Sequence, residues 1–162
     1  MHKNFVLIVD DNINSLKILS QVLHDAGITV TIAKSGEAVF NRVKQNRPDL
    51  ILLDIMLPDM DGFSVIQALK NNPETHDIPV IFMSALNDID SKVKGLSLGA
   101  VDYVSKPFQV DELILRVNTQ LKLQYLTQSL KVNNAILQKA KEGAELASRS
   151  KSEFLANISH EL

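Results

Sequence analysis

Five short runs of apolar residues recur in the first 108 residues, and they predict the strands of a sheet. Each run is almost continuously apolar, as is typical of parallel strands buried on both faces. The runs are FVLIVD (5–10), ITVTIA (28–33), LILLDI (50–55), IPVIFMS (78–84) and VDYVS (101–105).

The stretches between these runs carry apolar residues at helical spacing. The first of them has Ile13, Leu16, Leu19, Val22 and Leu23. Strands that alternate with helices predict an α/β fold with a five-stranded parallel sheet and right-handed crossovers. In such sheets, functional side chains gather at the carboxyl ends of the strands.

After Gln109, the alternation of strand-like and helical stretches ends, and a single long C-terminal helix is predicted. Its first part, from Val110 to Leu121, has apolar spacing suited to packing on the sheet. Apolar residues then recur in steps of three and four, which is typical of a coiled coil. An alternative is a solvated helix that folds back on its own domain. The positions of this seam are Leu123, Leu126, Leu130, Asn133, Leu137, Ala140, Ala144, Ala147, Lys151, Phe154 and Ile158.

The net charge and the lack of cysteine exclude some classes of site and partner. The chain has a net charge of −2 and no cysteine, which gives no sign of a nucleic-acid partner and excludes disulfides and thiolate zinc sites. No apolar run approaches the roughly 20 residues of a membrane span, and the start does not resemble a signal peptide. We therefore expect a soluble, cytoplasmic protein without nucleic-acid or membrane partners.

Three aspartates lie at the ends of predicted strands. Asp10 and Asp11 end the first strand and Asp54 the third, and these two strands are commonly neighbours in such folds. Three adjacent carboxylates need a counter-charge to stay ionised, and a hard divalent cation such as Mg²⁺ supplies it. The alternative is that Asp10 and Asp11 only cap the helix that starts near Ile13.

A hydroxyl and an ammonium at two further strand ends favour phosphoryl chemistry. Ser84 ends the fourth strand, and Lys106 follows the fifth, just before Pro107. A cation and a lysine offset the charge on phosphate oxygens, and a hydroxyl donates a hydrogen bond to them. A carboxylate can then act as nucleophile and form an acyl phosphate. Asp54, between the acidic pair and the Ser84–Lys106 side, is the best candidate.

This set of residues resembles the response-regulator receiver domain of two-component signalling. The resemblance covers residue 4 to about residue 121 and rests on Asp10-Asp11, Asp54, Ser84, Lys106-Pro107 and LPDMDG (57–62). It implies a flavodoxin-like fold. It also implies Mg²⁺, with Mn²⁺ as an alternative, held by Asp11, Asp54 and the backbone carbonyl of Met56, with Asp10 acting through water.

The same resemblance assigns roles on the other side of the site. Ser84 and Lys106 are expected to contact the phosphoryl group, and the Lys106-Pro107 peptide bond is expected to be cis. Tyr103 falls at the family's switch aromatic, which turns inward when Ser84 is drawn to the phosphate; the alternative is an ordinary half-buried tyrosine of the strand.

The last residues, KSEFLANISHEL (151–162), resemble the H-box of the histidine-kinase dimerisation domain, in which His160 would be phosphorylated. This predicts a receiver (1–121), a coiled-coil linker (122–150) and the truncated start of a kinase helix (151–162). The chain would then be the front part of a hybrid histidine kinase. It would form a homodimer through the C-terminal helix, and by itself it would bind no ATP.

A helix of roughly 80 Å would hold Asp54 far from His160, so we expect another histidine kinase or phosphotransfer protein to be the phospho-donor. Three alternatives remain. They are a response regulator with a different output domain, a phosphorylation-independent dimerisation module, and an enzyme with an aspartyl-phosphate intermediate.

Overall fold

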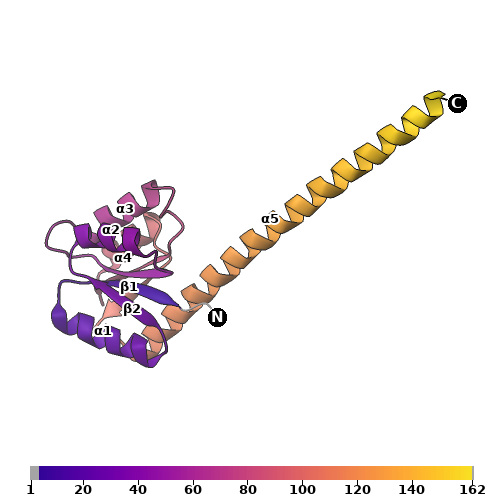
Figure 1. The fold of residues 1–162 in the computed structure, drawn as a ribbon. Coiled ribbons are helices and arrows are strands. Elements are labelled where there is room, and N and C mark those ends of the chain that lie inside the picture. The colour runs from indigo at the N-terminus through magenta and orange to yellow at the C-terminus, as the bar shows by residue number, and fades with distance from the viewer. Residues whose placement is uncertain (1–3, 162) are drawn as a thin grey trace. The chain divides into compact units, whose positions relative to one another are not determined.

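The computed structural model describes the backbone of residues 4–161 and the side chains of residues 4–145. Strands and helices alternate along the chain (Figure 1), as the apolar pattern predicts. The elements are β1 (Phe5–Val9), α1 (Ile13–Asp25), β2 (Thr29–Ala33), α2 (Gly36–Gln45), β3 (Leu50–Asp54), α3 (Gly62–Asn71), β4 (Val80–Ala85), α4 (Ile89–Ser97), β5 (Asp102–Lys106) and α5 (Val110–Glu161).

The five strands form one sheet in the order β2-β1-β3-β4-β5, and every neighbouring pair is parallel. This confirms the predicted α/β class and five-stranded parallel sheet with a long C-terminal helix, and the strand order is that of flavodoxin-like folds. Every residue of the central strand β3 is buried, because helices cover both faces of the sheet. That arrangement explains why the strands read as continuous apolar runs rather than alternating ones.

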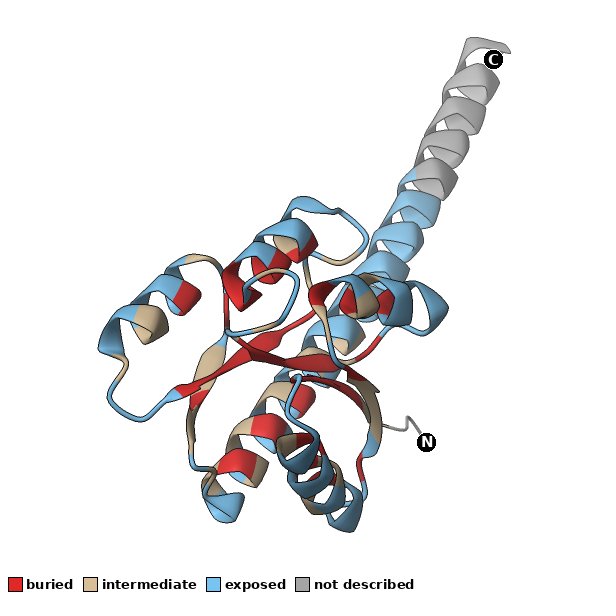
Figure 2. Ribbon diagram, turned by 90° about the vertical axis from the view of Figure 1, so that its left-hand side faces the viewer, coloured by how far each residue is buried: buried red, intermediate tan, exposed pale blue. Residues whose placement is uncertain are grey.

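Alternate residues of each strand point to opposite faces, and so the core has two halves. Leu7 and Val9 of β1 belong to a cluster with side chains of α2 and α3. Val6 and Ile8 belong to a second cluster with side chains of α1 and of the first turns of α5. Figure 1 shows α1 on one side of the sheet and α2, α3 and α4 on the other, and Figure 2 shows the buried residues concentrated between these layers.

The helix after β1 begins with a side-chain cap, because the first amides of a helix lack intrahelical partners. Asn12 supplies it, since its Oδ1 accepts hydrogen bonds from the amides of Asn14 (2.9 Å) and Ser15 (3.1 Å). The alternative in which Asp10 and Asp11 only cap this helix is therefore wrong. Asp10 instead accepts a hydrogen bond from the Asn12 amide at 3.0 Å.

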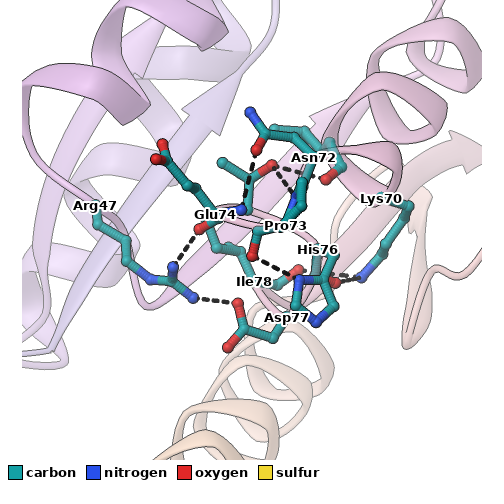
Figure 3. Close-up of polar contacts among 10 residues, drawn as sticks. Arg47, Lys70, Asn72, Pro73, Glu74, His76, Asp77 and Ile78 are labelled. Carbon is teal, nitrogen blue, oxygen red and sulfur yellow. Dashed lines mark hydrogen bonds and ion pairs between the residues drawn. The ribbon is translucent and has the colours of Figure 1, made fainter.

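The loop between α3 and β4 is held by polar contacts at the edge of the sheet where the strands begin (Figure 3). The guanidinium of Arg47 donates to the carbonyl of Glu74 and to the carboxylate of Asp77. The ammonium of Lys70 donates to the carbonyls of His76 (3.0 Å) and Ile78 (3.3 Å). These contacts fix the path of the chain into β4.

The chain divides into two units, Met1–Gln124 and Tyr125–Leu162, and α5 contributes to both. In the first unit, Leu113, Val117 and Leu121 of α5 are buried in the core. In the second unit, the described apolar side chains are exposed, among them Leu130 and Leu137. Within the described part of the chain, no helix combines the length and apolar character needed to cross a membrane.

Candidate functional site

Parallel pairing brings the predicted site residues to one edge of the sheet, where the strands end. Asp10 directly follows β1, and Asp54 is the last residue of β3. Asp54 is in register with Met83, so Ser84 lies one residue further along β4. Lys106, the last residue of β5, is in register with Ala85. The sheet order places the ends of β1, β3, β4 and β5 side by side in that sequence.

The three aspartates meet at this edge. Asp10, Asp11 and Asp54 each offer a carboxylate oxygen, and these atoms all lie within 4.8 Å of one another. The Nζ atom of Lys106 lies 3.0 Å from Oδ2 of Asp10 and 3.1 Å from Oδ2 of Asp54. The Asp10 side chain is fully buried and that of Asp54 is 12% exposed. The cluster thus joins one ammonium to two largely buried carboxylates.

The environment of Asp54 disfavours its charge. Burial raises the pKa of the Asp54 carboxyl, the Lys106 charge lowers it, and the Asp10 charge raises it again, with a net upward shift. For Lys106, burial lowers the pKa of the ammonium, but hydrogen bonds and charges from Asp10 and Asp54 outweigh burial and raise it. Lys106 is therefore firmly protonated, and one ammonium does not fully compensate the acidic cluster.

This donor set fits a hard divalent cation. Three carboxylates against one ammonium leave two uncompensated negative charges when all are ionised. Carboxylate oxygens that converge in this way are the ligands that Mg²⁺ prefers, usually with several waters retained. The side chain of Met56 is 78% exposed, and its amide points toward Asp54, with the nitrogen 3.4 Å from Oδ1.

Ser84 is the other buried polar side chain at this edge, being 4% exposed. Among the described residues, its Oγ atom is buried without a hydrogen-bond partner. Buried hydroxyls are usually paired, so this donor is available to a group that binds beside Asp54. With a cation held by the acidic cluster, the orphaned hydroxyl and the ammonium can accommodate an anion with several oxygens.

The predicted switch residues lie on β5 and just beyond it. The Lys106-Pro107 peptide bond is cis, as expected. Tyr103 is half-buried; its ring faces the Nζ atom of Lys92 at 4.9 Å and the guanidinium carbon of Arg116 at 5.6 Å. These contacts connect Tyr103 to α4 and α5, the two helices that the switch would have to influence.

His160 lies outside the residues whose side chains are described. The helical backbone of α5 includes it, but the described side chains end at residue 145. The H-box interpretation therefore remains a prediction from the sequence.

Gly62 is required by a close approach of two chain segments beside Asp54. A Cβ atom at Gly62 would lie 2.5 Å from the carbonyl oxygen of Asp54 and 2.9 Å from Cα of Ile55. Both neighbours are backbone atoms that cannot swing aside. We expect Gly62→Ala to destabilise the fold by about 1–3 kcal/mol and to weaken Mg²⁺ binding, as measured by chemical denaturation and metal titration.

Gly143→Ala is the matched control, because nothing lies within 4 Å of the added methyl group. Alanine favours a helix interior by about 1 kcal/mol over glycine, so this variant should lose no stability. Equal stability of the Gly62→Ala variant and the parent protein would contradict the close approach.

The sequence analysis gave no role to two polar side chains that the structure shows in specific contacts, one in the loop after β3 and one on α5. Asp59, inside the LPDMDG stretch, accepts hydrogen bonds from the first amides of α2. Arg116 of α5 pairs with Asp102 of β5 and with Glu112. The spacing of Glu112 and Arg116, four residues apart, could have indicated an ion pair on one helix face. No local pattern indicates the partner of Asp59.

Comparison with known proteins gives a family match. The family model described as the response regulator receiver domain matches residues 6–118. Among curated proteins, the DNA-binding dual master transcriptional regulator RpaA of Synechocystis is 42% identical over 117 residues, which is 72% of this chain and 48% of RpaA. The chain spans about half the length of the first curated relatives it matches.

A second curated relative is named as an enzyme and not as a transcriptional regulator. A Vibrio cholerae protein named "Probable cyclic di-GMP phosphodiesterase" is 40% identical over 117 residues, which is 72% of this chain and 26% of that protein. Among solved structures, the Francisella response regulator 1452 receiver domain superposes with a TM-score of 0.69 at 35% identity. That match covers 74% of this chain and 98% of the solved chain.

Proposed function

This chain belongs to the response regulator receiver domain family, and on that premise we propose that Asp54 is its phosphorylated residue. Receiver domains accept phosphate from histidine kinases or phosphotransfer proteins. The observation that carries the assignment is the double contact of Lys106 with Asp10 and Asp54. It places a positive charge beside both carboxylates, of which only that of Asp54 is partly exposed, at 12% against 0% for Asp10. Asp54 also lies in register with Met83, the neighbour of Ser84, whose hydroxyl is unpaired among the described residues.

The proposed reaction is a phosphoryl transfer to a carboxylate. An oxygen of Asp54 attacks the phosphorus of a donor phosphohistidine, and the phosphorus–nitrogen bond breaks as the oxygen–phosphorus bond forms. The electron pair stays on the donor imidazole nitrogen, which takes a proton from solvent. Lys106 binds and orients the transferred group through its charge, and Ser84 donates a hydrogen bond to one of its oxygens.

Asp10, Asp11, Asp54 and the backbone carbonyl of Met56 would hold Mg²⁺, with Mn²⁺ as the alternative ion. When bound, the ion supplies positive charge that offsets the carboxylates and the phosphate oxygens. The described acidic cluster supports this assignment. Ser84, Tyr103 and Pro107 would then form the switch, since Tyr103 lies between groups of α4 and α5.

The names of the relatives bear on which kind of output domain the receiver would control. RpaA is by name a DNA-binding transcriptional regulator and the Vibrio relative a cyclic di-GMP phosphodiesterase; neither is named as a histidine kinase. They favour a response regulator with a different output domain over the hybrid kinase that the 151–162 segment suggests. The family match ends at residue 118, so the domain boundaries beyond it and the role of His160 remain predictions.

The test is to supply the protein with acetyl phosphate and Mg²⁺ and to map the modified residue by mass spectrometry. We expect one phosphoryl group, on Asp54, that is labile to hydroxylamine as an acyl phosphate is. No uptake would favour the phosphorylation-independent dimerisation module, and a phosphoryl group on any other residue would overturn the assignment of Asp54.

We also propose that α5 forms a homodimer by pairing with a second copy of itself. Leu126, Leu130 and Leu137 share one stripe of the helix and are 46%, 62% and 66% exposed. In a parallel pair, the flanking positions would place Lys122 opposite Thr127 and Ile136 opposite Lys141. No like charges oppose each other there, so a second copy is a suitable partner.

Leu130→Asp is expected to weaken this dimer by at least about tenfold, or 1.4 kcal/mol, because it places a carboxylate in the apolar seam. Gln128→Asp adds the same charge on the opposite side of the helix and should leave association unchanged. Sedimentation equilibrium measures both. A parent protein that stays monomeric at all accessible concentrations would overturn the proposal.

A further inference from the structure

The loop between β3 and α3, residues 55–61, contacts the first turn of α2 through one carboxylate. Oδ1 of Asp59 accepts a hydrogen bond from the amide of Gly36 at 2.8 Å, and Oδ2 accepts one from the amide of Glu37 at 3.0 Å. The partners are 23 and 22 residues away in sequence. Both carboxylate oxygens are thus used to join two separate segments.

These contacts favour an ionised Asp59. The amides of Glu37 and Gly36 lower the pKa of the Asp59 carboxyl, and a negative charge is favourable at a helix N-terminus. The helix, however, already has its own cap, because Oγ of Ser35 accepts a hydrogen bond from the amide of Ala38 at 3.1 Å. Asp59 therefore adds a connection to the loop beyond what α2 needs in order to start.

A second contact secures the loop at the same place. A Cβ atom at Gly36 would lie 2.4 Å from Cγ of Met60, so Met60 packs directly against the backbone of α2. At its other end, the loop is closed by a hydrogen bond from the Gly62 amide to the Ile55 carbonyl at 2.6 Å. The loop is therefore held on α2 at its tip and beside Asp54 at its base.

We propose that Asp59 is a positioning residue, whose carboxylate holds the 55–61 loop against α2 and so fixes the backbone of Met56 beside the acidic cluster. This inference rests on the proposed function, because the group that Met56 would serve is the Mg²⁺ ion at Asp54. The alternative is that Asp59 is only an additional cap for α2. The two roles predict different effects on metal binding.

The experiment compares Asp59→Ala with Ser35→Ala. Each removes a side-chain acceptor from the N-terminus of α2, but only the first releases the loop. Mg²⁺ affinity is measured by NMR titration of the unphosphorylated protein, and stability by thermal unfolding. We expect both variants to unfold at lower temperature. Asp59→Ala should raise the Mg²⁺ dissociation constant about tenfold, and Ser35→Ala should leave it unchanged.

Asp59→Asn separates position from charge, because it removes the charge but keeps one acceptor oxygen. It should bind Mg²⁺ more tightly than Asp59→Ala does, and equal affinities for the two would assign the effect to charge and overturn the positioning role. Unchanged or equally weakened Mg²⁺ binding in Asp59→Ala and Ser35→Ala would overturn it as well. A parent protein that binds no Mg²⁺ would overturn the proposed function and this inference together.

Discussion

Asp54→Asn is expected to abolish phosphoryl uptake and, at neutral pH, to raise the free energy of unfolding of the metal-free protein. Uptake is lost because an amide oxygen does not displace the donor nitrogen as a carboxylate does. Stability rises because burial, with Asp10 nearby, raises the pKa of the Asp54 carboxyl. A raised pKa in the folded state means that the ionised form is less favourable there than in the unfolded chain.

The pH dependence follows from the direction of that shift. Ionisation of Asp54 lowers the free energy of unfolding by its full amount at pH values above the pKa that the group has in the folded state. This destabilisation disappears below the pKa that it has in the unfolded state, because the group is then protonated in both states. The stability difference between Asp54→Asn and the parent should therefore shrink as the pH falls through the pKa of Asp54. Denaturant unfolding at several pH values, without Mg²⁺, measures it.

Asp111→Asn is the matched control, because Asp111 lies exposed in the first turn of α5. It should take up phosphate as the parent does. A parent protein that is more stable than Asp54→Asn at neutral pH would contradict the unfavourable charge at Asp54. Continued uptake by Asp54→Asn would show that another residue is the acceptor.

Lys106→Met is expected to slow phosphoryl uptake by roughly 100- to 1,000-fold, the typical effect of removing one preorganised donor from a reacting oxygen. The ammonium lies 3.0 Å from Asp10 and 3.1 Å from Asp54. Its loss removes charge that would stabilise the transferring phosphoryl group. It also lets the pKa of Asp54 rise further, because Lys106 is what lowers it, and a smaller fraction of the nucleophile is then ionised.

Arg47→Met is the matched control for this loss of a cation. Arg47 holds the loop before β4 through Glu74 and Asp77, at the other edge of the sheet (Figure 3). The variant should lose some stability but take up phosphate at the parent's rate. Initial rates with acetyl phosphate at saturating Mg²⁺ make the comparison. Equal rates for Lys106→Met and the parent would remove Lys106 from the reaction.

Most of the fold was predictable from the sequence because its strands are buried on both sides. An apolar run as short as residues 50–53, between Asp49 and Asp54, is typical of a buried strand, because a buried helix would need a longer run. Once five such strands run parallel, their carboxyl ends must share an edge, so the meeting of Asp10, Asp54 and Lys106 follows from topology. The apolar pattern also predicted that a long helix follows β5.

Other features depended on geometry that no local pattern contains. Asp10, Asp11 and Asn12 are adjacent and all suitable as caps, and only the path of the backbone selects Asn12. The role of Asp59 depends on amides 22 and 23 residues away. Whether the hydroxyl of Ser84 is satisfied depends on every atom around it.

The contact between Lys106 and Asp10 joins residues that are 96 positions apart in the sequence, so the two side chains are synthesised at different times. During translation, Asp10 and Asp54 leave the ribosome well before Lys106 of β5, the cation that pairs with them. A nascent or clipped chain without β5 would carry its carboxylates with no fixed counter-charge. Under the proposed function, only molecules in which the sheet has been completed would be competent to accept a phosphoryl group.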